Sequence, residues 1–236
     1  MRRILLYMWC FCFAGTLLAE GVAREDSLAL VALYESTQGV SWRQSWDLET
    51  SVQHWQGITL SQGRVEAIDL RNNNLHGELP EELGQLSELQ RLELSNNFLM
   101  GSFPTQITRC VKLNRLSLDG NSLGAYLPAS LTQLSQLQWL NLSGNQFSGT
   151  IPAFLGEMIS LEVLQLSNNQ FSGLIPPSMG QLYQLQVLAL NDNQLEGNVP
   201  DTFRNLRRLH SLVLTGNLIA QSEIENWNRI ISRRTP

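Results

Sequence analysis

Leu137 to Met158 reads LQWLNLSGNQFSGTIPAFLGEM, and this stretch decides the fold of the chain. Three leucines lead to Asn145, and a glycine and an Ile-Pro pair follow it. The same skeleton returns when the stretch is shifted by 24 residues in either direction. A fixed period of about 20 to 50 residues indicates a repeat architecture, in which successive coils of the chain stack on one another.

Four columns of residues keep this period. The asparagine column consists of Asn73, Asn97, Asn121, Asn145, Asn169, Asn193 and Asn217. A leucine column three residues earlier consists of Leu70, Leu94, Leu118, Leu142, Leu166, Leu190 and Leu214. A glycine column consists of Gly77, Gly101, Gly149, Gly173 and Gly197, with Ala125 in place of one member. A proline column consists of Pro80, Pro104, Pro128, Pro152, Pro176 and Pro200.

Each column has a chemical role in the coil. The segment L-x-x-L-x-L alternates like a strand that is buried on one face. The chain then turns, and an inward asparagine amide supplies both donors and an acceptor to backbone groups inside the turn. Glycine permits the backbone conformation that follows. The segments after each proline are too short for a full helix and predict one or two helical turns. One coil cannot offset its own chain entropy, so stability has to come from stacking between capped ends.

The pattern L-x-x-L-x-L-x-x-N-x-L-x-G-x-I-P covers about Val65 to Ile219 and resembles the plant-type leucine-rich repeat. The resemblance implies an α/β fold: a right-handed solenoid with parallel strands on the concave face and 3₁₀ or short helical turns on the convex face. It also implies a binding role, usually toward protein or peptide, with no chemistry of its own. About seven repeats are expected over residues 64–219.

The two ends of the chain are predicted to differ from the repeats. Residues 1–23 have a basic start, an uncharged apolar stretch and small residues at Gly21 to Ala23, which is typical of a cleaved signal peptide. An uncleaved anchor is the alternative, although the apolar stretch is shorter than the about 20 residues that span a bilayer. No second spanning stretch follows. We therefore expect a secreted, extracellular or periplasmic protein, with a cell-surface location as a further option.

Residues 24–63 are expected to form an N-terminal cap. A helix from Ser27 to about Thr37, with Asp26 as its N-cap, is predicted to begin it. The cluster of Trp42, Trp46 and Trp55 is interpreted as a cover over the first coil, with a ligand-binding aromatic cluster as the alternative.

The sequence Trp55-Gln56-Gly57-Ile58 resembles the W-x-G-[VI] motif of plant-type N-terminal caps. Gln53 and Leu60 stand where plant members have cysteines. This brings the chain closer to similar single-domain proteins of bacteria or unicellular eukaryotes.

Residues 220–236 are expected to form a C-terminal cap helix. Ser222 and Glu225 have the spacing of a capping box. Ile224, Trp227 and Ile231 share one helical face, which we expect to lie over the last coil. A partner-binding helix is the alternative. Arg233 and Arg234 suit the negative C-terminal end of a helix.

The outward strand positions predict where a ligand binds. The first outward column is Ala67, Arg91, Arg115, Trp139, Val163, Val187 and Ser211. The second is Asp69, Glu93, Ser117, Asn141, Gln165, Ala189 and Val213. Because arginine and aromatic side chains concentrate binding energy at interfaces, we interpret Arg91, Arg115, Trp139, Val163 and Val187 as a recognition patch. The alternative is a solvated ion-pair surface of Arg91, Glu93 and Asp69, with Trp139 packed flat on its neighbours.

Several functions find no support in the sequence. The net charge of −5 argues against nucleic acid as a partner. No nucleophile–base pairing, metal-ligand spacing or phosphate-binding loop occurs, so we expect no enzyme activity, metal or cofactor. Cys110 lies in an apolar column and is predicted to be a buried, unreactive thiol. Asn141-Leu142-Ser143 is a possible N-glycosylation sequon, and a glycan there would cover the recognition patch.

Three functions remain from different classes. The first is a monomeric, secreted recognition module that binds a protein, a peptide or a glycan on its concave face. The second is an inhibitor of a cell-wall-degrading enzyme, because the repeat also resembles polygalacturonase-inhibiting proteins and receptor-like ectodomains. The third is a structural or ice-binding surface. That function needs a regular Ser/Thr ladder, whereas the column of Arg71, Ser95, Asp119, Ser143, Ser167, Asn191 and Thr215 is interrupted by charge.

Overall fold

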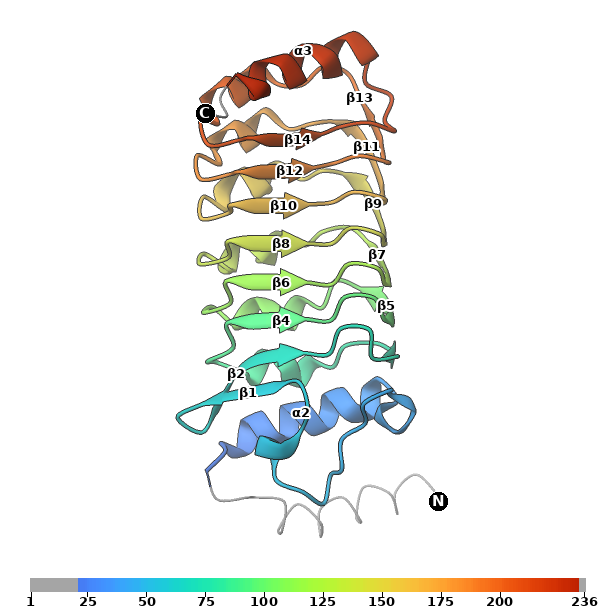
Figure 1. Ribbon diagram of the computed structural model, residues 1–236, viewed down its shortest axis with the longest axis vertical. Coiled ribbons are helices and arrows are strands. Elements are labelled where there is room, and N and C mark those ends of the chain that lie inside the picture. The colour runs from blue at the N-terminus through green and yellow to red at the C-terminus, as the bar shows by residue number, and fades with distance from the viewer. Residues whose placement is uncertain (1–20, 234–236) are drawn as a thin grey trace.

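The computed structural model describes residues 21–233 as a stack of coils between two helices (Figure 1). Helix α2 (Arg24–Ser36) lies at one end of the stack, and α3 (Gln221–Ser232) lies at the other. Residues 1–20 of the predicted signal peptide, and residues 234–236 of the predicted C-terminal cap, which include Arg234, lie outside the described residues. Within residues 21–233, no helix combines the length and the apolar character that crossing a bilayer requires.

One strand from each coil contributes to a sheet of eight strands. It contains β1 (Ile58–Ser61), β2 (Arg64–Asp69), β4 (Arg91–Glu93), β6 (Arg115–Ser117), β8 (Trp139–Asn141), β10 (Val163–Gln165), β12 (Val187–Ala189) and β14 (Ser211–Val213). β1 and β2 form an antiparallel hairpin, and all later neighbours are parallel. We call the solvent side of this sheet the concave face.

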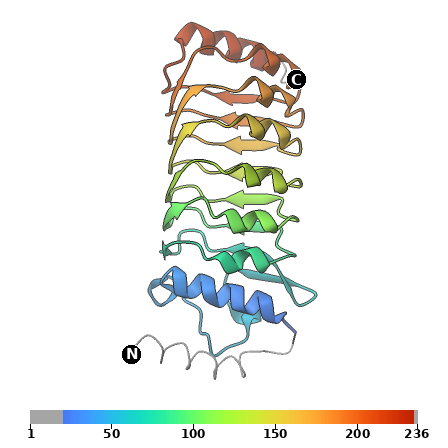
Figure 2. The same cartoon turned by 180° about the vertical axis from the view of Figure 1, so that it is seen from behind.

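A second sheet runs along one flank of the stack. Its six parallel strands are β3 (His76–Gly77), β5 (Phe98–Ser102), β7 (Ser122–Ala125), β9 (Gln146–Thr150), β11 (Gln170–Leu174) and β13 (Gln194–Glu196). The side opposite the concave face carries 3₁₀ helices (Figure 2). Those of the repeats are η3 (Glu81–Gln85), η4 (Thr105–Arg109), η5 (Ala129–Gln133), η6 (Ala153–Glu157), η7 (Pro177–Gln181) and η8 (Asp201–Asn205). The predicted α/β solenoid is confirmed.

The asparagine column joins each coil to the preceding one. Asn145 is buried, and its Nδ2 donates to Leu142 O of its own coil at 3.1 Å and to Leu118 O of the preceding coil at 2.9 Å. Its Oδ1 accepts from Leu123 N at 3.0 Å, also in the preceding coil. The corresponding contacts recur at Asn97, Asn121, Asn169, Asn193 and Asn217. The buried turns therefore leave these backbone groups paired, which avoids a penalty of about 1–3 kcal/mol for each unpaired group.

The glycine column fulfils two requirements at once. Gly149 has φ +80°, a left-handed backbone conformation that residues with a Cβ rarely adopt. A Cβ at Gly149 would also meet the ring of Tyr126 at 2.5 Å, because a side chain of the preceding coil lies across the glycine. Leu174 covers Gly197 in the same way. Ala125 also has φ +65°, and the residue at the covering position of the coil before it is Ser102, which is small.

Ala125→Gly is expected to raise the free energy of unfolding by about 0.5–1 kcal/mol. The substitution removes a left-handed penalty of about 1–2 kcal/mol and adds about 0.5–1 kcal/mol of chain entropy to the unfolded state. Urea unfolding followed by circular dichroism measures the difference. Gly149→Ala is the opposite control, and we expect it to lower the stability. An unchanged or lower urea midpoint for Ala125→Gly would contradict the assignment of strain to this residue.

The N-terminal cap differs from its prediction at the start of the helix. α2 begins at Arg24 with Ala23 as its N-cap and has no side-chain cap, so the prediction of Asp26 as the N-cap is wrong. Asp26 instead lies inside the first turn, fully buried, and accepts a hydrogen bond from Val65 N at 2.7 Å. Its carboxylate also binds the guanidinium of Arg64 at 2.9 and 3.1 Å. This carboxylate therefore connects the cap helix to β2.

The three tryptophans of the cap are structural. Trp42, Trp46 and Trp55 are each no more than 5% exposed, and Trp46 stacks on Trp55 with ring centroids 4.8 Å apart. Each indole N–H donates to a backbone carbonyl group, at Thr37, Gln56 and Asp47 respectively. The rings are buried and their N–H donors are already paired, so they are not available to a ligand. They cover the first coil, as expected from the sequence.

The C-terminal cap packs as expected but begins differently. Ile224, Trp227 and Ile231 are buried on the face of α3 that meets the core. The predicted capping box is wrong, because α3 begins at Gln221 after Ala220 and has no side-chain cap. Glu225 instead accepts a hydrogen bond from the Gln221 side chain at 3.1 Å. The helix is held by its apolar face rather than by a cap.

Candidate functional site

The first outward column lies in register across the concave face. Arg91 pairs with Arg115, Arg115 with Trp139, Trp139 with Val163 and Val163 with Val187 on successive strands from β4 to β12. The structure therefore brings the five residues of the predicted patch into one line across the strands. The line changes along its length from cationic through aromatic to aliphatic.

Arg115 is held in the middle of this line by two contacts. Its guanidinium lies 4.0 Å from the centroid of the Trp139 ring, a cation–π arrangement. Its Nε donates to the carboxylate of Glu93 on the neighbouring strand, and Glu93 is buried. The positive charge of Arg115 is thus already neutralised on the protein side, which makes it a rigid platform rather than a free cation.

Arg91 differs from Arg115 in both exposure and pairing. Its side chain is exposed and forms no ion pair with any residue between 21 and 233. Asp69, a neighbour in the second column, is bound instead by Arg71 at 2.7 Å, and this contact holds the pKa of Asp69 below its usual range. The predicted ion-pair surface therefore exists with different partners, and Arg91 remains the available cation of the patch.

The apolar half of the patch is less accessible than expected. Val163 is only 8% exposed because Trp139 and Val187 flank it on the two neighbouring strands, so the expectation of a solvent-facing valine there is wrong. Trp139 and Val187 are half-buried. The indole Nε1 of Trp139 is buried and has no hydrogen-bond acceptor within residues 21–233. A ligand would therefore meet the surface of Trp139 and Val187 rather than a deep pocket.

The ion pair of Glu93 with Arg115 is the contact of this site that the sequence reasoning missed, because it grouped Glu93 with Arg91 and Asp69 instead. The strand partner of Glu93 is Ser117, whereas Arg115 lies one step diagonally across β6. Diagonal neighbours on one sheet face lie within reach of long side chains. A spacing of 22 residues between an acid and a base, two short of the period, is the signal that could have revealed the pair.

The sequon residue Asn141 lies in the second column, beside the patch. It is half-buried, and its Oδ1 accepts a hydrogen bond from Ser143 N at 3.1 Å. The column considered for ice binding is also engaged: Ser95 and Ser167 are buried, and they donate to Asp119 and Asn191 respectively. These hydroxyl groups serve neighbouring coils, so the column offers no regular outward ladder.

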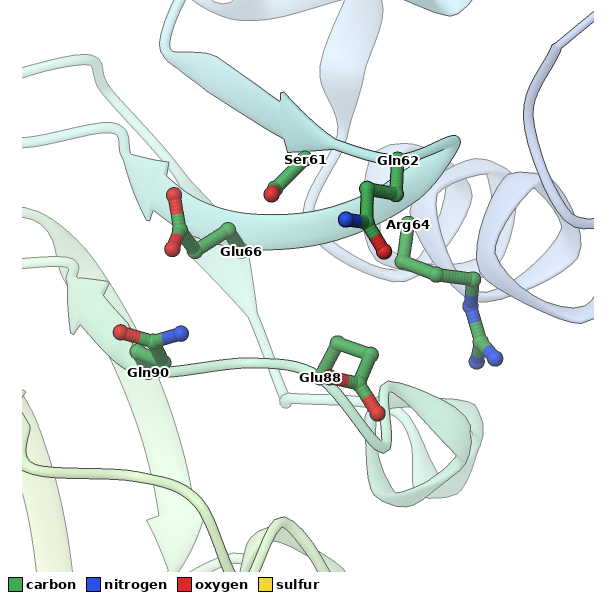
Figure 3. Close-up of a pocket in the computed structure, with 6 residues that line it drawn as sticks. All are labelled: Ser61, Gln62, Arg64, Glu66, Glu88 and Gln90. Atoms are coloured by element: carbon green, nitrogen blue, oxygen red, sulfur yellow. The ribbon is translucent and has the colours of Figure 1, made fainter.

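A polar depression of about 270 Å³ lies at the N-terminal edge of the sheet, between the β1–β2 hairpin and the chain before β4 (Figure 3). Figure 3 shows Glu66 and Gln90 on one side of it and Arg64 turned away from them. Arg64 binds Asp26, and Glu88 binds Lys112. Two of the three charged side chains that line the depression, Arg64 and Glu88, are thus already in ion pairs within the protein. The depression is therefore a weaker candidate for a ligand site than the concave patch.

The single cysteine of the described residues is buried, and these residues contain no cluster that could hold a metal ion. Cys110 is fully buried, its Sγ lies 3.3 Å from Leu83 O, and burial raises the pKa of the thiol to about 12. The thiol therefore stays protonated at neutral pH, as its apolar column suggested. Residues 21–233 contain no cluster of three or more His, Cys, Asp or Glu side chains that could hold a metal ion.

The repeat units match a known family. A profile described as "Leucine rich repeat" matches residues 87–147 and 159–219, and a second of the same description matches residues 64–86. The chain belongs to the leucine-rich repeat family. This leucine-rich repeat protein is 34% identical over 94 residues to the leucine-rich repeat receptor protein kinase EMS1 of Arabidopsis thaliana. That match covers 39% of the chain and 8% of the kinase.

Solved structures give two further likenesses. The ectodomain of the Arabidopsis receptor kinase HAESA, in complex with an IDA peptide hormone ligand, is 31% identical, with a TM-score of 0.75. The likeness covers 87% of this chain and 34% of that one. A plant ice-binding protein is 25% identical, with a TM-score of 0.77, and the likeness covers 85% of this chain and 73% of that one. The chain thus spans only a fraction of the receptors that it resembles.

Proposed function

We propose that this leucine-rich repeat protein is a secreted, non-catalytic recognition module that binds an extended peptide or protein segment across its concave face. The observation that carries the proposal is the line of Arg91, Arg115, Trp139, Val163 and Val187 on adjacent strands. The likeness to a peptide-bound ectodomain supports the proposal. The apolar stretch within residues 1–23 supports secretion.

The order of the side chains along this line predicts which chemical groups the ligand presents to the concave face. Arg91, as the unpaired cation, suits a carboxylate of the ligand, either a side chain or a chain terminus. Trp139 lies two strands beyond Arg91 and Val187 lies four strands beyond it, at about 4.8 Å for each strand spacing. Both suit an apolar side chain of the ligand. We therefore expect the ligand to lie across the strands, with an acidic group toward β4 and an apolar group toward β8 to β12.

The test is a selection from a displayed peptide library against the immobilised protein. Peptides selected by the wild type are expected to lose at least about tenfold in affinity for Trp139→Ala, because buried aromatic anchors carry much of the binding energy at interfaces. Arg91→Gln is expected to weaken the acidic peptides selectively.

Tyr126→Ala is the matched control, since Tyr126 is an aromatic residue that is 72% exposed and directly follows β7, away from the concave face. Circular dichroism would verify the fold of each variant. Equal affinity of the selected peptides for wild type and Trp139→Ala would refute the concave-face site.

A second candidate function is ice binding, favoured by the likeness to the plant ice-binding protein. The neighbouring strands β7, β9 and β11 present uncharged, mostly small or polar residues outward on the flank sheet, including Ser122, Gln146, Ser148, Gln170 and Ser172. Thermal hysteresis of the purified protein separates the two functions. Hysteresis that survives Trp139→Ala and is lost in Ser148→Lys would favour ice binding.

A further inference from the structure

A second depression, of about 430 Å³, lies at the C-terminal end of the stack, away from the concave patch. It is lined by Tyr183, Asn205, Arg207 and Arg208. Tyr183 follows η7 and Arg207 follows η8, so the two occupy equivalent positions in consecutive coils. Both bends are fixed by backbone hydrogen bonds, from Tyr183 N to Gln181 O at 2.8 Å and from Arg207 N to Asn205 O at 2.9 Å. The depression is therefore formed by parts of the coil that the repeat itself holds in place.

The two arginines have no ionic partner in the described part of the chain. Arg207 and Arg208 are both exposed, and neither forms an ion pair with any residue between 21 and 233. The same two positions of the other coils are mostly uncharged: they hold Ser87-Glu88, Val111-Lys112, Ser135-Gln136, Ile159-Ser160 and Tyr183-Gln184. The repeat does not require two cations here, so the pair is a special feature of this coil.

The charge of the whole chain is distributed unevenly around this pair. Residues 21–100 contain twelve acidic residues and five arginines, whereas residues 201–233 contain five arginines and three acidic residues. An anionic ligand is therefore repelled by residues 21–100 at the N-terminal end of the stack and attracted to its C-terminal end. Binding at this end leaves the concave face open.

We propose that this depression binds an anionic sugar unit of an acidic polysaccharide. The guanidinium groups of Arg207 and Arg208 match the geometry of a carboxylate or a sulfate. The ring of Tyr183, 56% exposed, offers an apolar surface for the C–H face of a sugar ring, and the Asn205 amide can pair with a hydroxyl group. The volume falls within the range of about 300–1,000 Å³ that is usual for small-ligand sites.

Affinity electrophoresis in native gels tests the proposal with defined polymers. Dextran sulfate supplies sulfate esters, alginate supplies carboxylates, and neutral dextran supplies neither. We expect at least one of the two anionic polymers, but not neutral dextran, to retard the wild-type protein. The retardation should fall steeply as the ionic strength approaches about 1 M, where charges are screened beyond about 3 Å. The difference between dextran sulfate and alginate identifies the anionic group.

The double variant Arg207→Gln/Arg208→Gln is expected to raise the apparent Kd at least about tenfold, since it removes both charge-assisted contacts. Tyr183→Ala is expected to raise it by a smaller factor. The matched control Arg24→Gln/Arg109→Gln also removes two exposed arginines, which lie far from the depression. Because salt screens charges at such distances, we expect its apparent Kd to stay within about twofold of the wild-type value. Trp139→Ala should bind as the wild type does, which makes this result independent of the concave-face proposal.

Three outcomes would overturn the proposal. Equal loss of retardation in the double variant and in its control would show a general charge effect. Retardation by neutral dextran, or by none of the polymers, would exclude an anionic sugar. Self-association of the wild type in sedimentation velocity that the double variant abolishes, without binding of any polymer, would instead assign the arginines to a contact with the acidic end of a second copy.

Discussion

Asn145→Ala is expected to lower the free energy of unfolding by about 3 kcal/mol. The amide of Asn145 lies in the middle of the stack and pairs with Leu118 O, Leu142 O and Leu123 N. Alanine leaves these buried backbone groups without partners, at about 1–3 kcal/mol each, and partial relaxation of the turn reduces the sum. Urea unfolding followed by circular dichroism at 222 nm would measure the loss, with the slope of the transition as a check on cooperativity.

Asn217→Ala is the matched control for this substitution. Asn217 makes the same contacts, with Leu190 O, Leu214 O and Leu195 N, but it lies in the last coil and is partly exposed. Water can reach the groups that it leaves, so we expect a cost of about 1 kcal/mol. Equal losses at the two positions would contradict the view that burial of the turn sets the energy of these amides.

Asp26→Ala is expected to lower the free energy of unfolding by about 2–3 kcal/mol. The fully buried carboxylate accepts from Val65 N and from Arg64, and hydrogen bonds to charged groups contribute about 1.5–3 kcal/mol each. Arg64 is 27% exposed and regains water when its partner is removed, which limits the loss. We also expect α2 to separate from β2 before the repeats unfold. Fluorescence of Trp42, Trp46 and Trp55 would then change at a lower urea concentration than the circular dichroism signal.

Glu25→Ala provides the control for Asp26→Ala. Glu25 lies 3.5 Å from the same Arg64, but its side chain is 51% exposed. Exposed ion pairs contribute about 0–1 kcal/mol, so the variant is expected to unfold almost as the wild type does. A loss at Glu25 as large as that at Asp26 would mean that charge near α2, rather than the buried contact with Val65, stabilises the cap.

Most of the fold could be predicted from the sequence because its determinants are periodic. Leu142 and Asn145 recur every 24 residues, so the strand, the turn and the stacking follow from one column each. One periodic signal was missed. The residue before each member of the asparagine column has a left-handed backbone conformation. These positions hold only asparagine, glycine and aspartate: Asn72, Asn96, Gly120, Gly144, Asn168, Asp192 and Gly216. These are the residue types that tolerate φ > 0 most readily.

The predictions that were wrong concern residues whose decisive contact is with a residue far away in the sequence. Asp26 has the local features of an N-cap, but its carboxylate is used by Val65, 39 residues away. The candidate site shows the same limit. The register of Arg91, Arg115 and Trp139 could be read from the period, whereas the pairing of Arg115 with Glu93 and the burial of Val163 depend on side-chain directions that the period does not specify.

The asparagine contacts also give the stack a direction, because the backbone hydrogen-bonding groups of each coil are paired by the coil that follows it. Each amide serves the turn of the coil that precedes it, as Asn169 serves Leu142 O and Phe147 N. A coil is thus finished only by its successor. During synthesis from the N-terminus, the newest coil of the growing stack therefore waits for the asparagine of the next coil, and Asn217 is the last of these amides. The apolar face of α3 then covers the last coil.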